Sequence, residues 1–156
     1  ILGRQQSIST PITGRSTVSA NTFVPMVAIR LKSTALDSVV IPDEFSAATL
    51  DNTNIFIRII ELPTVTGGTW ISYGDDSAVE YNITATGFSG GTVLSTTFVN
   101  ATNQGNVYKF PDRSLTQLLR NTTTTLGDTS GTFLITVASV GANKDGFASL
   151  GWIEVR

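Results

Sequence analysis

The sequence predicts an all-β protein, an antiparallel β-sandwich of jelly-roll type with about eight to ten strands and at most one short helix. Thr and Ser fill 39 of the 156 positions, whereas charged residues make up only 14%. Several segments alternate apolar and polar residues with the period of two that is typical of strands. Short turns rich in Gly, Asp and Asn separate these segments, and such spacing is typical of a sandwich or barrel.

The chain divides into two predicted parts, an extended N-terminal arm or linker over residues 1–22 and a β-sandwich domain over residues 23–156. The first part is polar, contains Gly3, Pro11 and Gly14, and shows no sustained periodicity. It is either a frayed terminus or an arm that docks on a neighbouring subunit. The first residue is not Met, so we expect a processed product or a fragment of a longer protein.

The first strands of the domain are predicted from alternation and from turn residues. Residues 27–32 alternate apolar and polar side chains, which indicates a half-buried strand. Residues 38–42 form a short predicted strand that Pro42 stops. Residues 43–52 are the stretch with helical character, because Asp43 can cap a helix, and a loop is the alternative.

The segment NIFIRIIELP, residues 54–63, is apolar on both faces except at Arg58 and Glu61. Gly67 and Gly68 then predict a hairpin turn. We expect a short helical turn that contains Leu115, Leu118 and Leu119. Further strands are predicted over residues 69–73, 79–84, 92–99, 106–110, 132–140 and 147–156.

The last strand, FASLGWIEVR, is also apolar on both faces, with Trp152 on one and Ile153 on the other. Such a strand is either central and covered within its own chain, or it meets another chain with its second face. We favour the second interpretation for both double-sided strands. The predicted oligomer-interface residues are Phe56, Ile60, Leu62 and Trp152.

The composition excludes several classes of chemistry. The chain has no Cys and no His, which excludes structural zinc, thiol catalysis and the Ser-His-Asp triad. A net charge of −2 with scattered basic residues argues against nucleic-acid binding. No apolar run approaches the roughly 20 residues of a membrane helix, so we predict no membrane insertion. We also predict no cofactor and no metal.

The carboxylates and aromatic residues leave two ligand-related possibilities. Asp75 and Asp76 lie in a predicted turn, and no spacing brings two carboxylates together as a glycosidase requires, so we predict no enzyme. Aromatic rings can stack on sugars. We therefore select two loop aromatics, Tyr73 and Tyr108, as candidate ligand contacts. Three Asn-x-Thr matches, at Asn82, Asn100 and Asn121, are expected by chance in a chain so rich in Thr.

Four segments carry a family resemblance: FVPMVAIRLKST (23–34), WISYGDDSAVEYNITAT (70–86), SGGTVLSTTFV (89–99) and TFLITVASVGANKDGFASLGWIEVR (132–156). In this order they resemble a β-domain of tailed-bacteriophage structural proteins. The likeness covers most of residues 23–156 as a pattern of short motifs.

The resemblance implies a non-enzymatic virion component: a tail fibre, a tail-associated protein or a capsid decoration protein. It implies a homo-oligomer, with a trimer favoured, in contact with other virion proteins. A host-surface glycan is a further partner that the resemblance suggests. The alternative is a carbohydrate-binding module or adhesin domain of a secreted protein, which would be a monomer with an exposed aromatic platform. A carboxylate-based glycan hydrolase ranks third.

Overall fold

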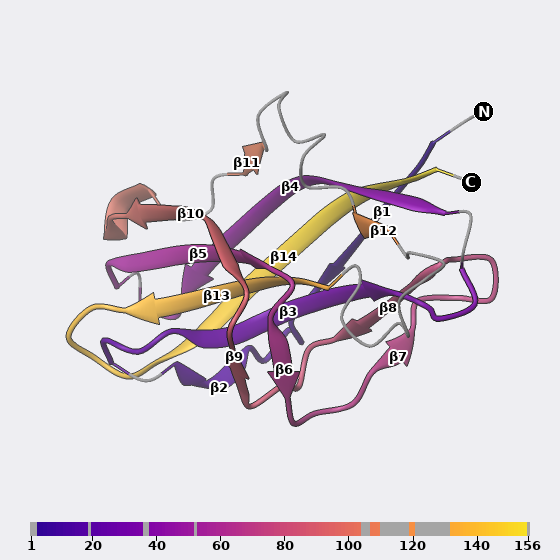
Figure 1. Ribbon diagram of the computed structural model, residues 1–156. Coiled ribbons are helices and arrows are strands. Elements are labelled where there is room, and N and C mark those ends of the chain that lie inside the picture. Colours follow the sequence, from indigo (N-terminus) through magenta and orange to yellow (C-terminus); the bar gives the residue numbers. More distant parts are fainter. Residues whose placement is uncertain are drawn as a thin grey trace.

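The fold is all-β and antiparallel, as the sequence predicts, in a computed structural model that describes residues 3–18, 20–35, 38–51, 53–103, 107–109, 119–120 and 132–155. Two six-stranded sheets pack face to face, and a two-stranded ribbon lies outside them (Figure 1). The helical structure of the described residues is one short 3₁₀ turn, η1 (Ala101–Asn103). The predicted antiparallel β-sandwich is therefore confirmed.

The first sheet, sheet A, is built around the long strand β14 (Lys144–Val155). Its order is β1-β14-β4-β11, with β2 also paired to β14 and β12 also paired to β4. The other strands of sheet A are β1 (Arg4–Ser9), β2 (Arg15–Val18), β4 (Val39–Thr49), β11 (Tyr108–Lys109) and β12 (Leu119–Arg120).

The second sheet, sheet B, has the order β10-β5-β13-β3-β8-β7. The ribbon outside it pairs β6 with β9, and both strands cross in front of β3 and β13 in Figure 1. The strands of sheet B are β3 (Val24–Leu31), β5 (Ile55–Glu61), β7 (Ile71–Ser72), β8 (Val79–Asn82), β10 (Thr92–Val99) and β13 (Phe133–Ser139). Those of the ribbon are β6 (Thr64–Thr66) and β9 (Gly87–Ser89).

The main core lies between the facing surfaces of sheets A and B. Alternate residues of each central strand point into it, because successive side chains of a strand point to opposite faces. Each fully buried large apolar side chain contributes about 1.5–3 kcal/mol relative to an exposed one. The largest of these side chains include Trp152, Phe133, Met26, Ile29, Ile55, Ile57, Ile59 and Leu150.

The described part of the predicted N-terminal arm contains two strands of sheet A, β1 and β2. β1 pairs with β14 from Arg4 opposite Glu154 to Ser9 opposite Ser149. The guanidinium of Arg15 donates to the carbonyl oxygens of Ile83 and Ala85 at 2.6 and 2.5 Å. The segment is extended, but it docks on its own domain.

The partial burial of Arg15 also affects the pKa of its side chain. Burial lowers the pKa of its guanidinium, because desolvation disfavours the charged form. The two carbonyl oxygens that it reaches belong to the connection after β8 in sheet B. Arg15 therefore connects β2 of sheet A to the segment that follows β8 of sheet B.

The helical character predicted for residues 43–52 is also wrong, because these residues continue β4 to Thr49. Phe45 and Ala47 are buried in the core, as alternation in a strand requires. Pro42 does not stop the strand. It lies opposite Trp152 where the β14–β4 register shifts, and such a bulge tolerates a residue that lacks an N–H group.

Part of the predicted segment 106–121 lies outside the described residues. The proposed end of a strand at Pro111 and the helical turn around Leu115 and Leu118 belong to this part. The described pieces on either side, β11 and β12, both pair with β4. Leu119, which was expected in that turn, is the first residue of β12.

Candidate interaction surface on sheet B

Trp152, a predicted interface residue, lies in the core between the two sheets. Its side chain is fully buried, its ring meets Tyr73 edge-on at 5.1 Å between centroids, and its Nε1 donates to Oε1 of Gln6 at 3.0 Å. The side chain is therefore unavailable to a neighbouring subunit, and its assignment to an interface is corrected. Trp152 lies on the same face of β14 as Leu150, which also points inward.

Ile60, another predicted interface residue, is buried on the outer side of sheet B. Together with Ala28 and Leu134 it forms a second, smaller core, which the ribbon covers with Val65 and Phe88. The outer face of β5 is apolar here because its own chain folds over it. This assignment is corrected as well.

The remaining two predicted interface residues, Phe56 and Leu62, lie at the surface, with 38% and 50% of their area exposed. Phe56 does not stand alone, since its ring packs against that of Phe98 from β10 at 5.1 Å between centroids. Phe98 is 52% exposed. Two neighbouring phenyl rings are thus open to solvent on the outer face of sheet B.

The surface around these rings follows from strand register. Phe98 lies opposite Phe56, and Phe56 lies opposite Ala138, so the three side chains form one row across the sheet. In the neighbouring row Thr96 lies opposite Arg58, whose guanidinium sits 4.1 Å above the ring of Phe23. We name this surface the Phe56 face: Phe23, Phe56, Arg58, Thr96, Phe98 and Ala138.

A shallow groove of about 430 Å³ adjoins the Phe56 face. Phe23 and Phe88 both line it, together with Pro25. The groove therefore extends the aromatic surface from the start of β3 towards the ribbon.

The Phe56 face ends at β10, the outermost strand of sheet B. Among the described residues, β5 is the strand that pairs with β10, so the other edge of β10 has no strand partner there. Charged residues and Pro are two features by which edge strands avoid unwanted pairing, and the sequence of β10, TVLSTTFV, contains neither. β10 does contain a third such feature, a bulge between Val93 and Ser95.

Sequence reasoning missed Phe23 and Phe98 as surface residues. Phe98 occupies a position in a predicted strand where alternation does not say which face is covered. A usable signal was present, because four of the eight residues of TVLSTTFV are polar, as expected for a strand at the margin of a sheet.

The two candidate ligand contacts, Tyr73 and Tyr108, are half-buried and pack within the domain. Tyr73 meets Trp152 and, at 6.5 Å between centroids, Tyr81. Tyr108 stacks on Phe45 at 5.4 Å. Neither ring stands free on a loop tip, so the structure does not bring them together as an aromatic platform.

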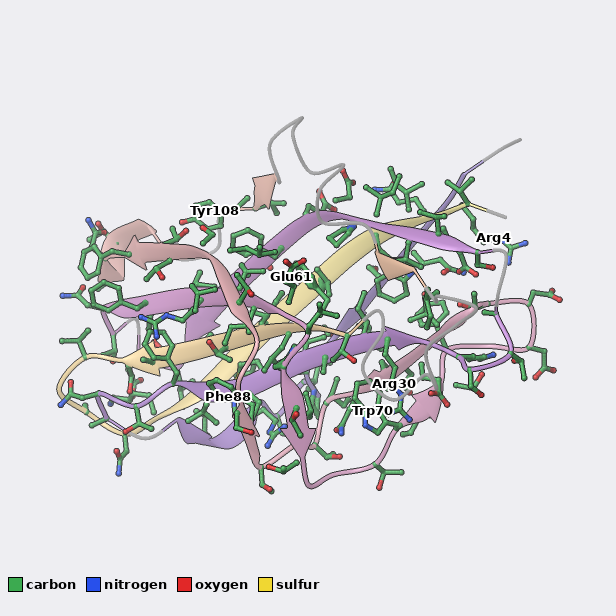
Figure 2. The ribbon with its side chains drawn as sticks, in the orientation of Figure 1. Arg4, Arg30, Glu61, Trp70, Phe88 and Tyr108 are labelled. Atoms are coloured by element: carbon green, nitrogen blue, oxygen red, sulfur yellow. The ribbon has the colours of Figure 1, made fainter. Side chains whose placement is uncertain are left out.

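Arg30 covers one face of the Trp70 indole ring, so that face is not open to a ligand. The guanidinium of Arg30 stacks 4.0 Å from the centre of the indole and its Nε donates to Glu80 at 2.9 Å. Figure 2 shows Arg30 and Trp70 side by side, with Tyr108 well away from them in this view. Trp70 covers the second core below the ribbon.

The buried carboxylate of Glu154 joins the two sheets. One oxygen accepts from the backbone N–H of Ala78, and the other accepts from the hydroxyl of Ser77 at 3.0 Å. Asp75 and Asp76, by contrast, are exposed in the turn before β8. No group of three or more acidic side chains that could hold a metal ion occurs among the described residues.

Two of the Asn-x-Thr matches differ in accessibility. Asn82 is buried, donates to the carbonyl of Gly67 at 3.1 Å and accepts from the N–H of Thr84 at 3.0 Å. Asn100 is exposed after β10. The third match, at Asn121, lies outside the described residues.

No protein-family model, curated protein or solved structure matches the chain. In the part of the chain that the structure describes, no helix has the length and apolar character needed to cross a membrane.

Proposed function

We propose that the chain is a non-enzymatic structural protein of a bacteriophage virion, a fibre or capsid-decoration subunit that works as a homo-oligomer. The observation that carries this proposal is the exposed Phe56–Phe98 pair beside the edge of β10, which has no strand partner among the described residues. Exposed apolar surface in a folded domain is a common mark of a protein–protein contact, and interface centres are enriched in aromatic residues.

The character of the Phe56 face favours a protein partner over a sugar. Sugar sites combine an aromatic ring with several polar groups that fix the hydroxyls. Here the two exposed rings are phenyl groups without a polar atom and are tilted by 56° to each other. The one charged side chain of the face, Arg58, is stacked on Phe23. The carbohydrate-binding module therefore remains the second candidate.

The virion assignment rests on the sequence resemblance together with this surface. The rigid sandwich supplies a durable body, and contacts with other virion proteins position it in the particle. Loop tips are proposed to meet a host-surface glycan. The number of subunits, three by the resemblance, stays a prediction.

The first experiment is the solution mass of the purified chain by light scattering at a micromolar and a tenfold lower concentration. We expect a multiple of the 16.6 kDa chain mass. A monomer at both concentrations would contradict the homo-oligomer. The carbohydrate-binding module would then take first place, and a glycan array would test it.

A further inference from the structure

We propose that β10 pairs in antiparallel fashion with β10 of a second copy, around a two-fold axis that passes between Thr97 and its copy. This pairing joins two copies of sheet B into one continuous sheet. The inference rests on the proposed homo-oligomer and names the surface and the symmetry through which it forms. It expects two subunits in place of the three that the resemblance implies.

The edge of β10 differs from the other sheet edges of the described chain. An edge strand presents a row of unpaired N–H and C=O groups, which is a template for another strand. β10 presents eight residues without a charge, whereas β7 at the opposite edge of sheet B has only two residues. β1, at an edge of sheet A, carries the exposed charge of Arg4.

The two faces of β10 are fixed by its register with β5. Thr96 and Phe98 lie opposite Arg58 and Phe56 and point outward. Ser95, Thr97 and Val99 lie opposite the core residues Ile59, Ile57 and Ile55 and share the inner face.

A strand can pair with its own copy only in a register that places outward residues opposite outward residues. Pairing centred on Thr97 meets this condition for five residues of each strand. It sets Thr96 opposite Phe98 and Ser95 opposite Val99. Pairing centred on Thr96 fails after three residues, because the bulge would place the inward Leu94 opposite the outward Phe98.

The same register brings the exposed aromatic rings together. Diagonal neighbours across an antiparallel pair lie about 7–8 Å apart, within reach of aromatic side chains. The two copies of Phe98 are diagonal neighbours in the register centred on Thr97. Each is already packed on Phe56, so four phenyl rings form one row across the seam.

The charges of the Phe56 face do not oppose this pairing. No charged residue lies within β10, so like charges do not meet across the seam. Arg58 lies on β5, one strand away from the seam. The two copies of β5 are separated by three strand spacings, about 14 Å, which exceeds the Debye length at physiological salt.

The first test uses the absence of cysteine from the chain. A residue on the two-fold axis lies opposite its own copy, with about 4.5–5.5 Å between Cα atoms, a distance that a disulfide spans. Thr97→Cys is therefore expected to form a covalent dimer under mild oxidation, seen on a non-reducing gel. Thr64→Cys, exposed on the ribbon, is the matched control and should remain monomeric on the gel.

The second test uses charge. Thr96→Lys and Thr96→Glu each place two like charges near each other across the seam, so each variant alone is expected to sediment as a monomer. An equimolar mixture of the two should recover the dimer. Thermal unfolding of each variant tests whether it is folded. Thr64→Lys is the control variant and is expected to leave the wild-type mass unchanged. Sedimentation is followed from about 1 to 100 µM, because an edge-to-edge contact of this kind is a small interface.

The outcomes separate this inference from the proposed function. A trimer, or an oligomer that Thr96→Lys does not dissociate, overturns the pairing of β10 and leaves the homo-oligomer standing. A wild-type monomer over the whole concentration range overturns both. Equal cross-linking of Thr97→Cys and Thr64→Cys overturns the register.

Discussion

β14 lies near the centre of sheet A and β5 lies next to the edge of sheet B, and the two strands differ in what covers their outer faces. The N-terminal segment lies close to the outer side of β14 at both ends of that strand. A Cβ at Gly3 would lie 2.7 Å from Ile153, and one at Gly14 would lie 2.9 Å from the ring of Phe147. Gly14 also has a φ of 75°, which favours glycine.

The outer side of β5 is covered over only part of its length. The ribbon buries Ile60 at one end, whereas Phe56 at the other end stays exposed beside Phe98. The difference shows that an apolar second face does not by itself indicate a subunit contact. It is consistent with the proposed subunit contact only where no described segment of the same chain lies over it, as at the Phe56 face.

The largest expected loss of stability comes from a comparison of the inner and outer faces of β14. Trp152→Ala removes the largest fully buried side chain, so we expect a loss of about 3–5 kcal/mol in the free energy of unfolding. Ile153→Ala, on the half-buried outer face, is expected to cost about 1 kcal/mol. Urea unfolding followed by circular dichroism measures both. Similar losses for the two variants would show that the outer face of β14 is as well covered as the core.

A second pair of variants compares the covered and the open end of β5. Ile60→Ala leaves a cavity below the ribbon and is expected to cost about 2–4 kcal/mol. Phe56→Ala is expected to cost the isolated subunit less than about 1 kcal/mol, because its ring is partly solvated. Urea unfolding at low protein concentration avoids any contribution from association. A larger loss for Phe56→Ala than for Ile60→Ala would contradict the open face.

The smallest of the three leading losses concerns the N-terminal segment. Arg15→Ala removes two charge-assisted hydrogen bonds that this partly exposed side chain donates to backbone carbonyl oxygens. We therefore expect a loss of about 1–2 kcal/mol in the free energy of unfolding. Arg4→Ala, at the exposed start of β1, is the control and should lie within about 0.5 kcal/mol of wild type. Equal stability of the Arg15 variant and wild type would show that these two hydrogen bonds do not hold the N-terminal segment to sheet B.

The strands that the sequence predicts best are those with a strong apolar period. Ile55, Ile57 and Ile59 point to one face of β5, and their burial follows from alternation. The N-terminal strands are not predictable in this way, since β1 is paired through backbone groups and only Ile8 contributes apolar packing. Backbone pairing leaves no pattern in the side chains, so a polar strand resembles a linker.

The candidate surface is only partly predictable for a related reason. Alternation separates Phe56 from Ile57 but does not reveal that the ribbon covers Ile60 or that Phe98 lies beside Phe56. The position of Trp152 required knowing which face of β14 meets sheet B. These are properties of tertiary contact, and a period of two contains no information about them.

The pairing of β1 with β14 has a mechanical consequence. Because Arg4 lies opposite Glu154 in an antiparallel pair, β1 begins beside the end of β14, and both strand ends lie on the same side of the domain in Figure 1. A tension applied across these two strand ends does not shear the two strands along their length. It loads the hydrogen bonds between β1 and β14 one after another from the Arg4 end, while β14 stays paired with β4 on its other side.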